Sequence, residues 1–140
     1  MPNVPYILVA DDDPEDQEML AERFKRRNPT AWVKLLGSAY EALDYLDACT
    51  PEELPQLIVT DYKMPGLTGA EFIGSLQKDD RYRHIHKIVW STSNNQEYVG
   101  LSLKSGADRY FTKPNSVKDF DKIVDFLTQL FRSASRDPNL

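Results

Sequence analysis

The most informative segment of the chain reads Leu57-Ile58-Val59-Thr60-Asp61-Tyr62-Lys63-Met64-Pro65-Gly66. Its first four residues have the character of a buried strand, and they run directly into an aspartate and a Pro-Gly loop. A strand that ends in Asp presents its carboxylate at the rim of a sheet, where open α/β folds bind their ligands. On its own the segment is equally typical of a strand followed by an Asx-type turn, so the other strands must decide between the two interpretations.

Four further segments have strand character and alternate with amphipathic helices. The segment 6–10 is apolar throughout, which is typical of a strand buried on both faces. Alternating strands and helices indicate one parallel sheet with helices on both faces, an α/β fold of the doubly wound (βα)5 type. The strands are expected at 6–10, 32–36, 57–60, 88–91 and 109–112, and the helices after Asp13, after Ser38, at 70–77, at 94–104 and at 117–131.

Length and composition fit a small acidic domain. The chain has 140 residues, a length typical of one domain, and a net charge of −5. The domain is expected at 1–131, and the segment 132–140, which has nothing to bury, is expected to be a disordered tail. The acidic balance argues against direct nucleic-acid binding, since the basic cluster at 23–27 fits a helix end, where cations stabilise the dipole. No apolar run approaches the roughly 18 residues of a membrane span, so no membrane insertion is expected. The single cysteine, Cys49, fits a cytoplasmic protein.

Polar side chains gather where the predicted strands end. In a parallel sheet all carboxyl ends lie at the same edge, so these side chains should converge on one crevice. Carboxylates this close repel one another unless a cation neutralises them, and a hard divalent ion such as Mg²⁺ takes oxygen ligands. The residues concerned are Asp11 and Asp12 after the first strand, Asp61 after the third, Ser91 and Thr92 after the fourth, and Lys113 after the fifth.

This set of residues suits phosphoryl transfer. With a metal ion shared between Asp12 and Asp61, the free oxygen of Asp61 can attack a phosphorus atom and form an aspartyl phosphate. The metal ion, Lys113 and the hydroxyl of Ser91 can then neutralise the charge on the phosphoryl oxygens. Each residue alone fits a cap, a turn or a solvated side chain, but their coincidence at successive strand ends predicts a phosphoryl site.

The order and spacing of these motifs resemble the receiver domain of bacterial two-component response regulators, of the stand-alone, chemotaxis-regulator-like kind. The resemblance covers nearly the whole chain. It implies a flavodoxin-like five-stranded sheet of order 2-1-3-4-5. It also implies a signalling switch rather than an enzyme, since such a domain catalyses only its own phosphorylation and dephosphorylation. The matching motifs are 7–12, 60–66, 91–92, 106–108 and Lys113-Pro114.

The resemblance implies a phospho-acceptor and a set of metal ligands. Asp61 is the expected acceptor of a phosphoryl group from a sensor histidine kinase or a phosphotransfer protein. Asp12, Asp61 and the backbone carbonyl of Lys63 are the expected ligands of Mg²⁺. Asp11 is expected to act on the same ion mainly through a bound water.

The resemblance also implies how phosphorylation is read out. Lys113, Ser91 and Thr92 are expected to contact the phosphoryl group, and the bond before Pro114 is expected to be cis. Ser91 and Tyr110 are the expected switch, in which the hydroxyl moves toward the phosphoryl oxygens and the aromatic ring fills the vacated space. The surface formed by the fourth helix, the fifth strand and the last helix would then change its affinity for a downstream protein. The same surface is a candidate homodimer interface.

Three features depart from the family pattern. Lys63 stands two residues after the acceptor, at a position that the family varies, and we expect it to alter the lifetime of the phosphoryl group. His86 and Lys87 replace residues that are often Pro and aliphatic, so the fourth strand is expected to begin late, at Ile88. His84 and His86 have no third ligand nearby in sequence and are not expected to form a metal site.

Three alternatives stay open at this point. A Mg²⁺-dependent phosphatase resembling haloacid dehalogenases would use the Asp-x-Asp spacing within 11–13, but it leaves Asp61 without a role. A flavodoxin-like electron carrier would share the strand order, but three aspartates would repel the FMN phosphate. A receiver that only binds partners is disfavoured by the intact acid pair, the acceptor and Lys113. The sequence names neither the kinase nor the downstream target, which is expected to be reached by protein contact.

Overall fold

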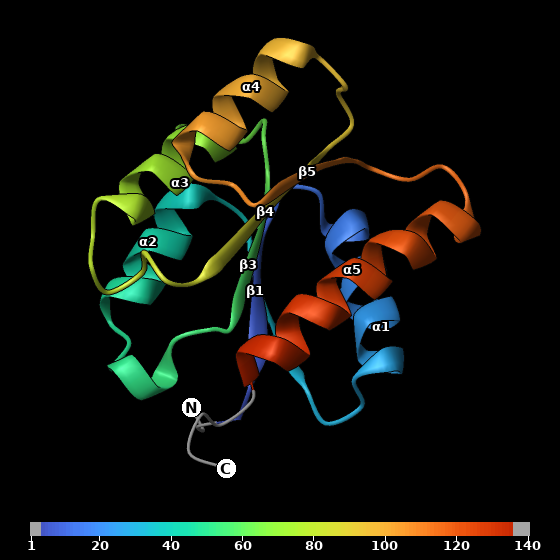
Figure 1. Ribbon diagram of the computed structural model, residues 1–140, viewed down its shortest axis with the longest axis horizontal. Helices are drawn as coiled ribbons and strands as arrows, with labels where there is room; N and C mark the ends of the chain where they lie inside the picture. Colours follow the sequence, from blue (N-terminus) through green and yellow to red (C-terminus); the bar gives the residue numbers. More distant parts are fainter. Residues whose placement is uncertain (1–3, 136–140) are drawn as a thin grey trace.

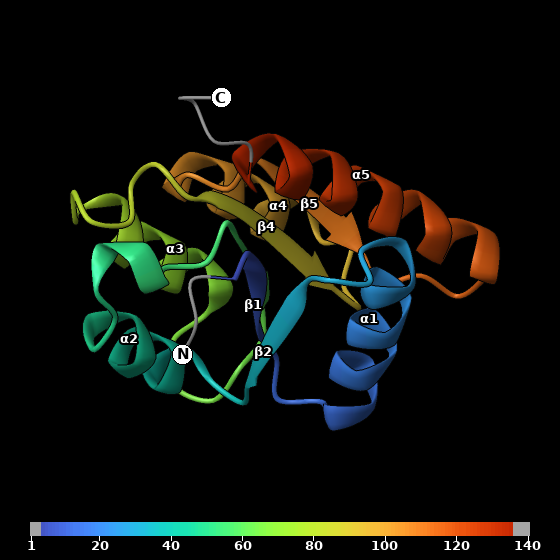
Figure 2. The same cartoon turned by 90° about the horizontal axis from the view of Figure 1, so that it is seen from below.

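One parallel sheet with helices on both faces makes up the computed structural model, which describes residues 4–135 (Figure 1). The strand order is β2-β1-β3-β4-β5, as the resemblance implied. Helices α1 and α5 cover one face of the sheet, and α2, α3 and α4 cover the other, which is also visible in the second view (Figure 2). The strands are β1 (Tyr6–Ala10), β2 (Trp32–Leu36), β3 (Leu57–Asp61), β4 (His86–Ser91) and β5 (Arg109–Thr112).

The helices occupy the segments that the apolar periodicity predicts. Each begins shortly after a carboxyl end of a strand, so the βα loops all lie at one edge of the sheet. A short 3₁₀ helix, η1 (Pro51–Glu53), precedes β3. The α-helices are α1 (Pro14–Arg27), α2 (Ala39–Asp47), α3 (Gly69–Gln77), α4 (Gln96–Ser105) and α5 (Val117–Ser135).

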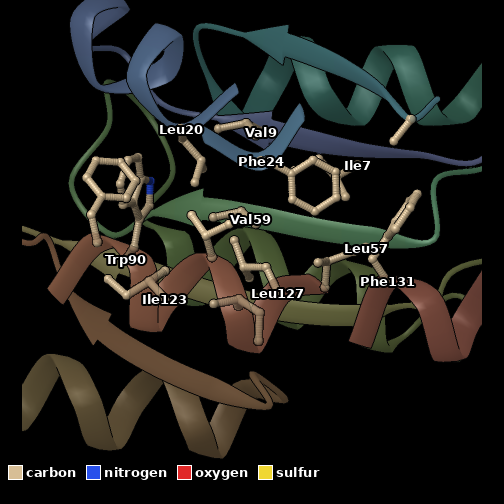
Figure 3. Close-up of a cluster of buried hydrophobic side chains, with 14 residues drawn as sticks. Ile7, Val9, Leu20, Phe24, Leu57, Val59, Trp90, Ile123, Leu127 and Phe131 are labelled. Atoms are coloured by element: carbon tan, nitrogen blue, oxygen red, sulfur yellow. The ribbon is translucent and has the colours of Figure 1, made fainter. Parts of the chain in front are cut away.

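Strand β1 lies at the centre of two apolar layers. Its side chains alternate, so that Ile7 and Val9 face α1 and α5 while Leu8 and Ala10 face α2 and α3. All five residues of β1 are buried, because helices cover both faces of a parallel sheet. The larger layer is shown in Figure 3, where the side chains of β1, β3 and β4 meet those of α1 and α5.

Helix α1 is fixed at both ends, which places the acidic loop that precedes it. The side chain of Asp13 accepts hydrogen bonds from the backbone N–H groups of Glu15 and Asp16, as expected for an N-cap. At the other end, Arg23 and Arg27 pair with acidic residues of α5, including Asp121. The basic cluster is therefore a helix end that docks on a neighbouring helix, in agreement with the sequence-based expectation.

Strand β4 begins at His86, two residues earlier than expected. The reason is Lys87, which is 1% exposed and lies within the strand. Its ammonium donates hydrogen bonds to the backbone carbonyls of Tyr82, Arg83 and Ile85, and burial lowers its pKa to about 8. The backbone N–H of Lys87 also donates to Asp108, at 2.8 Å. A lysine can occupy this strand position because the preceding turn supplies carbonyl acceptors inside the protein.

Helix α5 continues to Ser135, so the expected boundary at 131 is wrong by four residues. Arg132 holds the additional turn: its guanidinium donates to the side chain of Asn28 at 3.2 Å and to the carbonyl of Arg27 at 2.7 Å. The rest of the expected tail, 136–140, lies outside the described residues. None of the helices described between residues 4 and 135 has the length and apolar character needed to cross a membrane.

Candidate functional site

Three carboxylates meet at the carboxyl edge of the sheet. Asp11 and Asp12 directly follow β1, and Asp61 is the last residue of β3, which pairs with β1. One oxygen from each of the three carboxylates can be chosen so that all lie within 4.8 Å of one another. Asp11 and Asp61 are buried, whereas Asp12 is exposed. The expected convergence of Asp11, Asp12 and Asp61 is confirmed.

Lys113 supplies the positive charge at this edge. Its ammonium lies 3.0 Å from Asp61 Oδ2, 2.9 Å from Asp11 Oδ2 and 2.8 Å from Asp16 Oδ2. It donates hydrogen bonds to Asp61 and Asp16. Asp11 Oδ2, although buried and close, accepts no hydrogen bond from any group in residues 4–135. The site therefore holds one buried carboxylate oxygen that only charge attraction satisfies.

Burial and charge shift the protonation equilibria of this cluster. Burial raises the pKa of Asp11 to about 6, although Lys113 and the N–H of Asp13 act in the opposite direction. Burial alone would lower the pKa of Lys113, but the carboxylates of Asp16, Asp11 and Asp61 raise it above its usual range. Lys113 is therefore charged at neutral pH, and its positive charge stabilises the buried carboxylates of Asp11 and Asp61.

The backbone around Asp61 holds its carboxylate in a fixed orientation. Asp61 Oδ1 accepts a hydrogen bond from the N–H of Tyr62 at 2.7 Å, which leaves Oδ2 facing Lys113. The N–H of Gly69 donates to the carbonyl of Tyr62 at 2.7 Å and closes the loop that follows β3. A Cβ atom at Gly69 would lie 2.4 Å from the carbonyl oxygen of Asp61, so the close approach of α3 to the acceptor requires glycine.

The fourth and fifth strands bring their polar residues to the same edge. Ser91 is the last residue of β4 and is 1% exposed, and its carbonyl accepts from the N–H of Lys113 at 2.7 Å. Its hydroxyl accepts from the N–H of Ser93 at 3.2 Å. Tyr110 is half-buried and donates to the carbonyl of Ser93 at 2.6 Å. Thr92 is exposed beside Ser91. The two expected switch residues, Ser91 and Tyr110, thus both contact Ser93.

A model of the response regulator receiver domain matches residues 7–125. The chain belongs to this family. It is a receiver domain of two-component phosphorelay signalling, in which phosphorylation of an aspartate and dependence on Mg²⁺ are general. Membership of the receiver family therefore argues against both the phosphatase and the electron-carrier alternatives.

Relatives of the receiver domain share most of its length. The two-component response regulator ORR13 of Oryza sativa subsp. japonica is 30% identical over 123 residues, which are 88% of this chain and 98% of the relative. The phosphorylated cyanobacterial phytochrome response regulator RcpA has a TM-score of 0.83 at 22% identity, covering 96% of this chain and 99% of that one. The Mn²⁺-bound form of response regulator Rcp1 has a TM-score of 0.76 at 23% identity, covering 89% and 92%. The two structures establish the fold.

One expectation from the family pattern is wrong. Among residues 4–135 of the receiver domain no peptide bond is cis, so the bond between Lys113 and Pro114 is trans. The trans form is favoured even before proline, by about 0.5–1 kcal/mol. Here it is compatible with both the hydrogen bond from Lys113 to the Ser91 carbonyl and the reach of the ammonium to the carboxylates.

Lys63 extends away from the backbone toward α4. Its side chain is exposed, and its ammonium lies 5.3 Å from the centre of the Tyr98 ring. That ring stacks on Tyr62, with centroids 4.3 Å apart. A cation–π contact with Tyr98 thus holds the Lys63 ammonium beside the loop that follows Asp61.

Sequence reasoning missed two neighbours of Lys113. Asp16 lies in the first turn of α1, and its carboxylate is the closest of the three acids to the ammonium. The ring of Trp90, which was expected only as a strand residue, has its centre 5.0 Å from the same ammonium.

Proposed function

We propose that Asp61 is the phospho-acceptor of this receiver domain. The observation that carries the proposal is the placement of the Asp61 carboxylate, which meets those of Asp11 and Asp12 at the edge of the sheet and contacts Lys113 through Oδ2. This oxygen attacks the phosphorus atom of a phosphohistidine, the new O–P bond forms as the P–N bond breaks, and the histidine nitrogen takes up a proton. The donor is a sensor histidine kinase or a phosphotransfer protein.

The donor set fits a divalent cation. Asp11 Oδ2 is buried without a hydrogen bond, and all three acids offer the hard oxygen ligands that Mg²⁺ prefers. Asp11, Asp12, Asp61 and the backbone carbonyl of Lys63 would hold the ion. When bound, it neutralises charge on the phosphoryl oxygens.

Three further residues would contact the phosphoryl group. The ammonium of Lys113 already donates to Asp61 and would follow the added negative charge. Ser91 is the last residue of β4 and Thr92 follows it directly, while Trp90 of the same strand is paired with Asp61 in the sheet. These groups stabilise the charge that develops during transfer. The domain promotes only its own phosphorylation and dephosphorylation.

The readout would begin at Ser91 and Tyr110. Phosphorylation attracts the hydroxyl of Ser91, whose present partner is the N–H of Ser93. Because Tyr110 donates to the carbonyl of Ser93, a displacement of this loop releases the tyrosine and lets its ring move inward. The α4–β5–α5 surface then changes shape and with it the affinity for a downstream protein or for a second copy of the chain. The cytoplasmic location and the absence of nucleic-acid binding stay predictions.

Small-molecule phosphodonors test this proposal without a kinase. The protein is incubated with acetyl phosphate or phosphoramidate, with and without Mg²⁺, and its intact mass is measured. One base-labile phosphoryl adduct is expected, dependent on Mg²⁺ and lost in Asp61→Asn. An adduct that persists in Asp61→Asn would assign the acceptor elsewhere. A folded protein that forms no adduct would instead be a receiver that only binds partners.

A further inference from the structure

We propose that Asp16 is a positioning residue for Lys113, which it holds in the unphosphorylated protein and releases when Asp61 is phosphorylated. This inference rests on the proposed phosphorylation of Asp61. Asp16 lies in the first turn of α1, 97 residues from Lys113 in sequence, and its Oδ2 atom lies 2.8 Å from the ammonium. The ammonium donates hydrogen bonds to Asp16 on one side and to Asp61 on the other.

Phosphorylation changes what the ammonium faces. Asp61 Oδ1 is occupied by the N–H of Tyr62, so the O–P bond forms at Oδ2, the oxygen that Lys113 now contacts. That oxygen becomes part of an acyl phosphate and loses most of its negative charge. The charge is carried instead by the terminal phosphoryl oxygens, which lie farther out and are stronger acceptors. The ammonium follows this charge outward and leaves the esterified Oδ2, so it moves away from at least one of the two acids that keep their charge, Asp11 and Asp16.

Differences in burial determine which partner is released. Of the two acids that keep their charge, Asp11 has a fully buried side chain, whereas the side chain of Asp16 is 30% exposed. Separating a buried ion pair leaves an unsolvated charge, whereas an exposed carboxylate is resolvated by water. Asp16 also lies at the N-terminus of α1, where the helix dipole stabilises a negative charge without Lys113. Asp16 is therefore the partner that gives up the ammonium.

Asp16 consequently competes with the phosphoryl group for one cation. The competition favours the unphosphorylated state, because only in that state is the hydrogen bond to Asp16 complete. Removal of the Asp16 charge is expected to leave Lys113 free for the phosphoryl group. A residue with a purely structural role in α1 would act in the opposite direction, since its loss would loosen the site and reduce phosphorylation.

Titration with phosphoramidate in excess Mg²⁺ tests the inference. The phosphorylated fraction is read by intact mass for the natural protein and for Asp16→Asn. The variant is expected to reach half-maximal phosphorylation at a roughly two- to fivefold lower phosphoramidate concentration, as expected for the loss of a partly exposed ion pair. Its phosphoryl group is expected to decay more slowly by a similar factor. Asp16→Glu keeps the charge and should restore the natural behaviour.

Asp13→Asn is the matched control. It makes the same change of charge at the start of the same helix, and asparagine caps a helix as well as aspartate does. Asp13 is exposed and does not pair with Lys113 in the described structure. The phosphoramidate concentration that half-phosphorylates Asp13→Asn should therefore stay near that of the natural protein. Thermal unfolding of each variant confirms that the fold is intact.

The outcomes separate this inference from the proposed function. If the natural protein forms the Asp61 adduct but Asp16→Asn responds as the natural protein does, or needs more phosphoramidate, the release of Lys113 by Asp16 is refuted. An equal shift in Asp13→Asn would also refute it, because the effect would then be one of general charge. If the natural protein forms no adduct, the proposed acceptor role of Asp61 is refuted, and the inference on Asp16, which rests on it, is refuted with it.

Discussion

Replacement of Lys113 by methionine should destabilise the protein, because it removes the cation from a buried acidic cluster. Lys113 is 8% exposed and Asp11 is fully buried, so the change leaves a buried charge without a partner. Breaking such a pair typically costs about 3–5 kcal/mol of the free energy of unfolding, whereas the partly exposed pair with Asp16 contributes about 1 kcal/mol or less. At pH 7.5 and without Mg²⁺ we expect a loss of about 3–5 kcal/mol for Lys113→Met.

The loss should depend on pH in a defined window. The pKa of Asp11 is raised from 3.8 to about 6, so between these values the folded state binds a proton that the unfolded state lacks, and stability falls as pH rises. Without Lys113 the pKa of Asp11 rises further, and the window extends above pH 6. Each pH unit there costs the variant about 1.4 kcal/mol that the natural protein does not lose. The deficit should therefore grow between pH 6 and pH 7.5, by at most about 2 kcal/mol.

Urea unfolding at pH 5.5, 6 and 7.5, in EDTA and in excess Mg²⁺, measures these quantities. Mg²⁺ should reduce the deficit, because a divalent cation neutralises the same carboxylates and stabilises the state that binds it. Lys118→Met removes an equal charge from an exposed position of α5, and it should change stability by no more than about 0.5 kcal/mol. A deficit below 1 kcal/mol at pH 7.5 in EDTA, or one that does not change with pH, would refute this account of the site.

The remaining predictions concern the acceptor loop and the switch. Ser91→Ala should still form the phosphoryl adduct but lose most of the phosphorylation-dependent NMR shifts of Tyr110; full shifts in that variant would remove Ser91 from the switch. Lys63→Ala should change the decay rate of the phosphoryl group at Asp61, measured by mass after the donor is removed, and an unaltered rate would exclude a role for this side chain. Gly69→Ala should lower the free energy of unfolding by about 1–3 kcal/mol, because the added Cβ would clash with the Asp61 carbonyl, and a neutral effect in urea unfolding would show that α3 can shift freely.

Much of the acidic site was predictable because a parallel sheet gathers its strand ends. Asp11, Asp61 and Ser91 lie at or directly after the ends of apolar runs, so their convergence follows once the strands are assigned. The same reasoning could not assign Asp16. An acid in a first helical turn satisfies the helix dipole wherever it points, and only the three-dimensional path of the chain from α1 to the end of β5 reveals its contact with Lys113.

The start of β4 and the end of α5 were misjudged for a related reason. Lys87 reads as a surface residue, but its environment is set by carbonyl groups of a turn whose conformation the sequence pattern does not specify. Arg132 likewise reads as the polar end of a helix, yet it is held by Asn28, more than a hundred residues away. In both cases a charged side chain is satisfied by backbone or side-chain acceptors brought close only in the folded state.

The enclosure of Lys87 also determines which chemistry can reach it. An acylating reagent attacks the free-base form of an amine and must approach it through water, but this ammonium is 1% exposed and surrounded by carbonyl oxygens. Surface lysines such as Lys118 should acquire a label within minutes. Lys87 should acquire one only when β4 separates from the turn that precedes it. The rate at which this amine is modified therefore reports how often the amino end of β4 separates from the preceding turn.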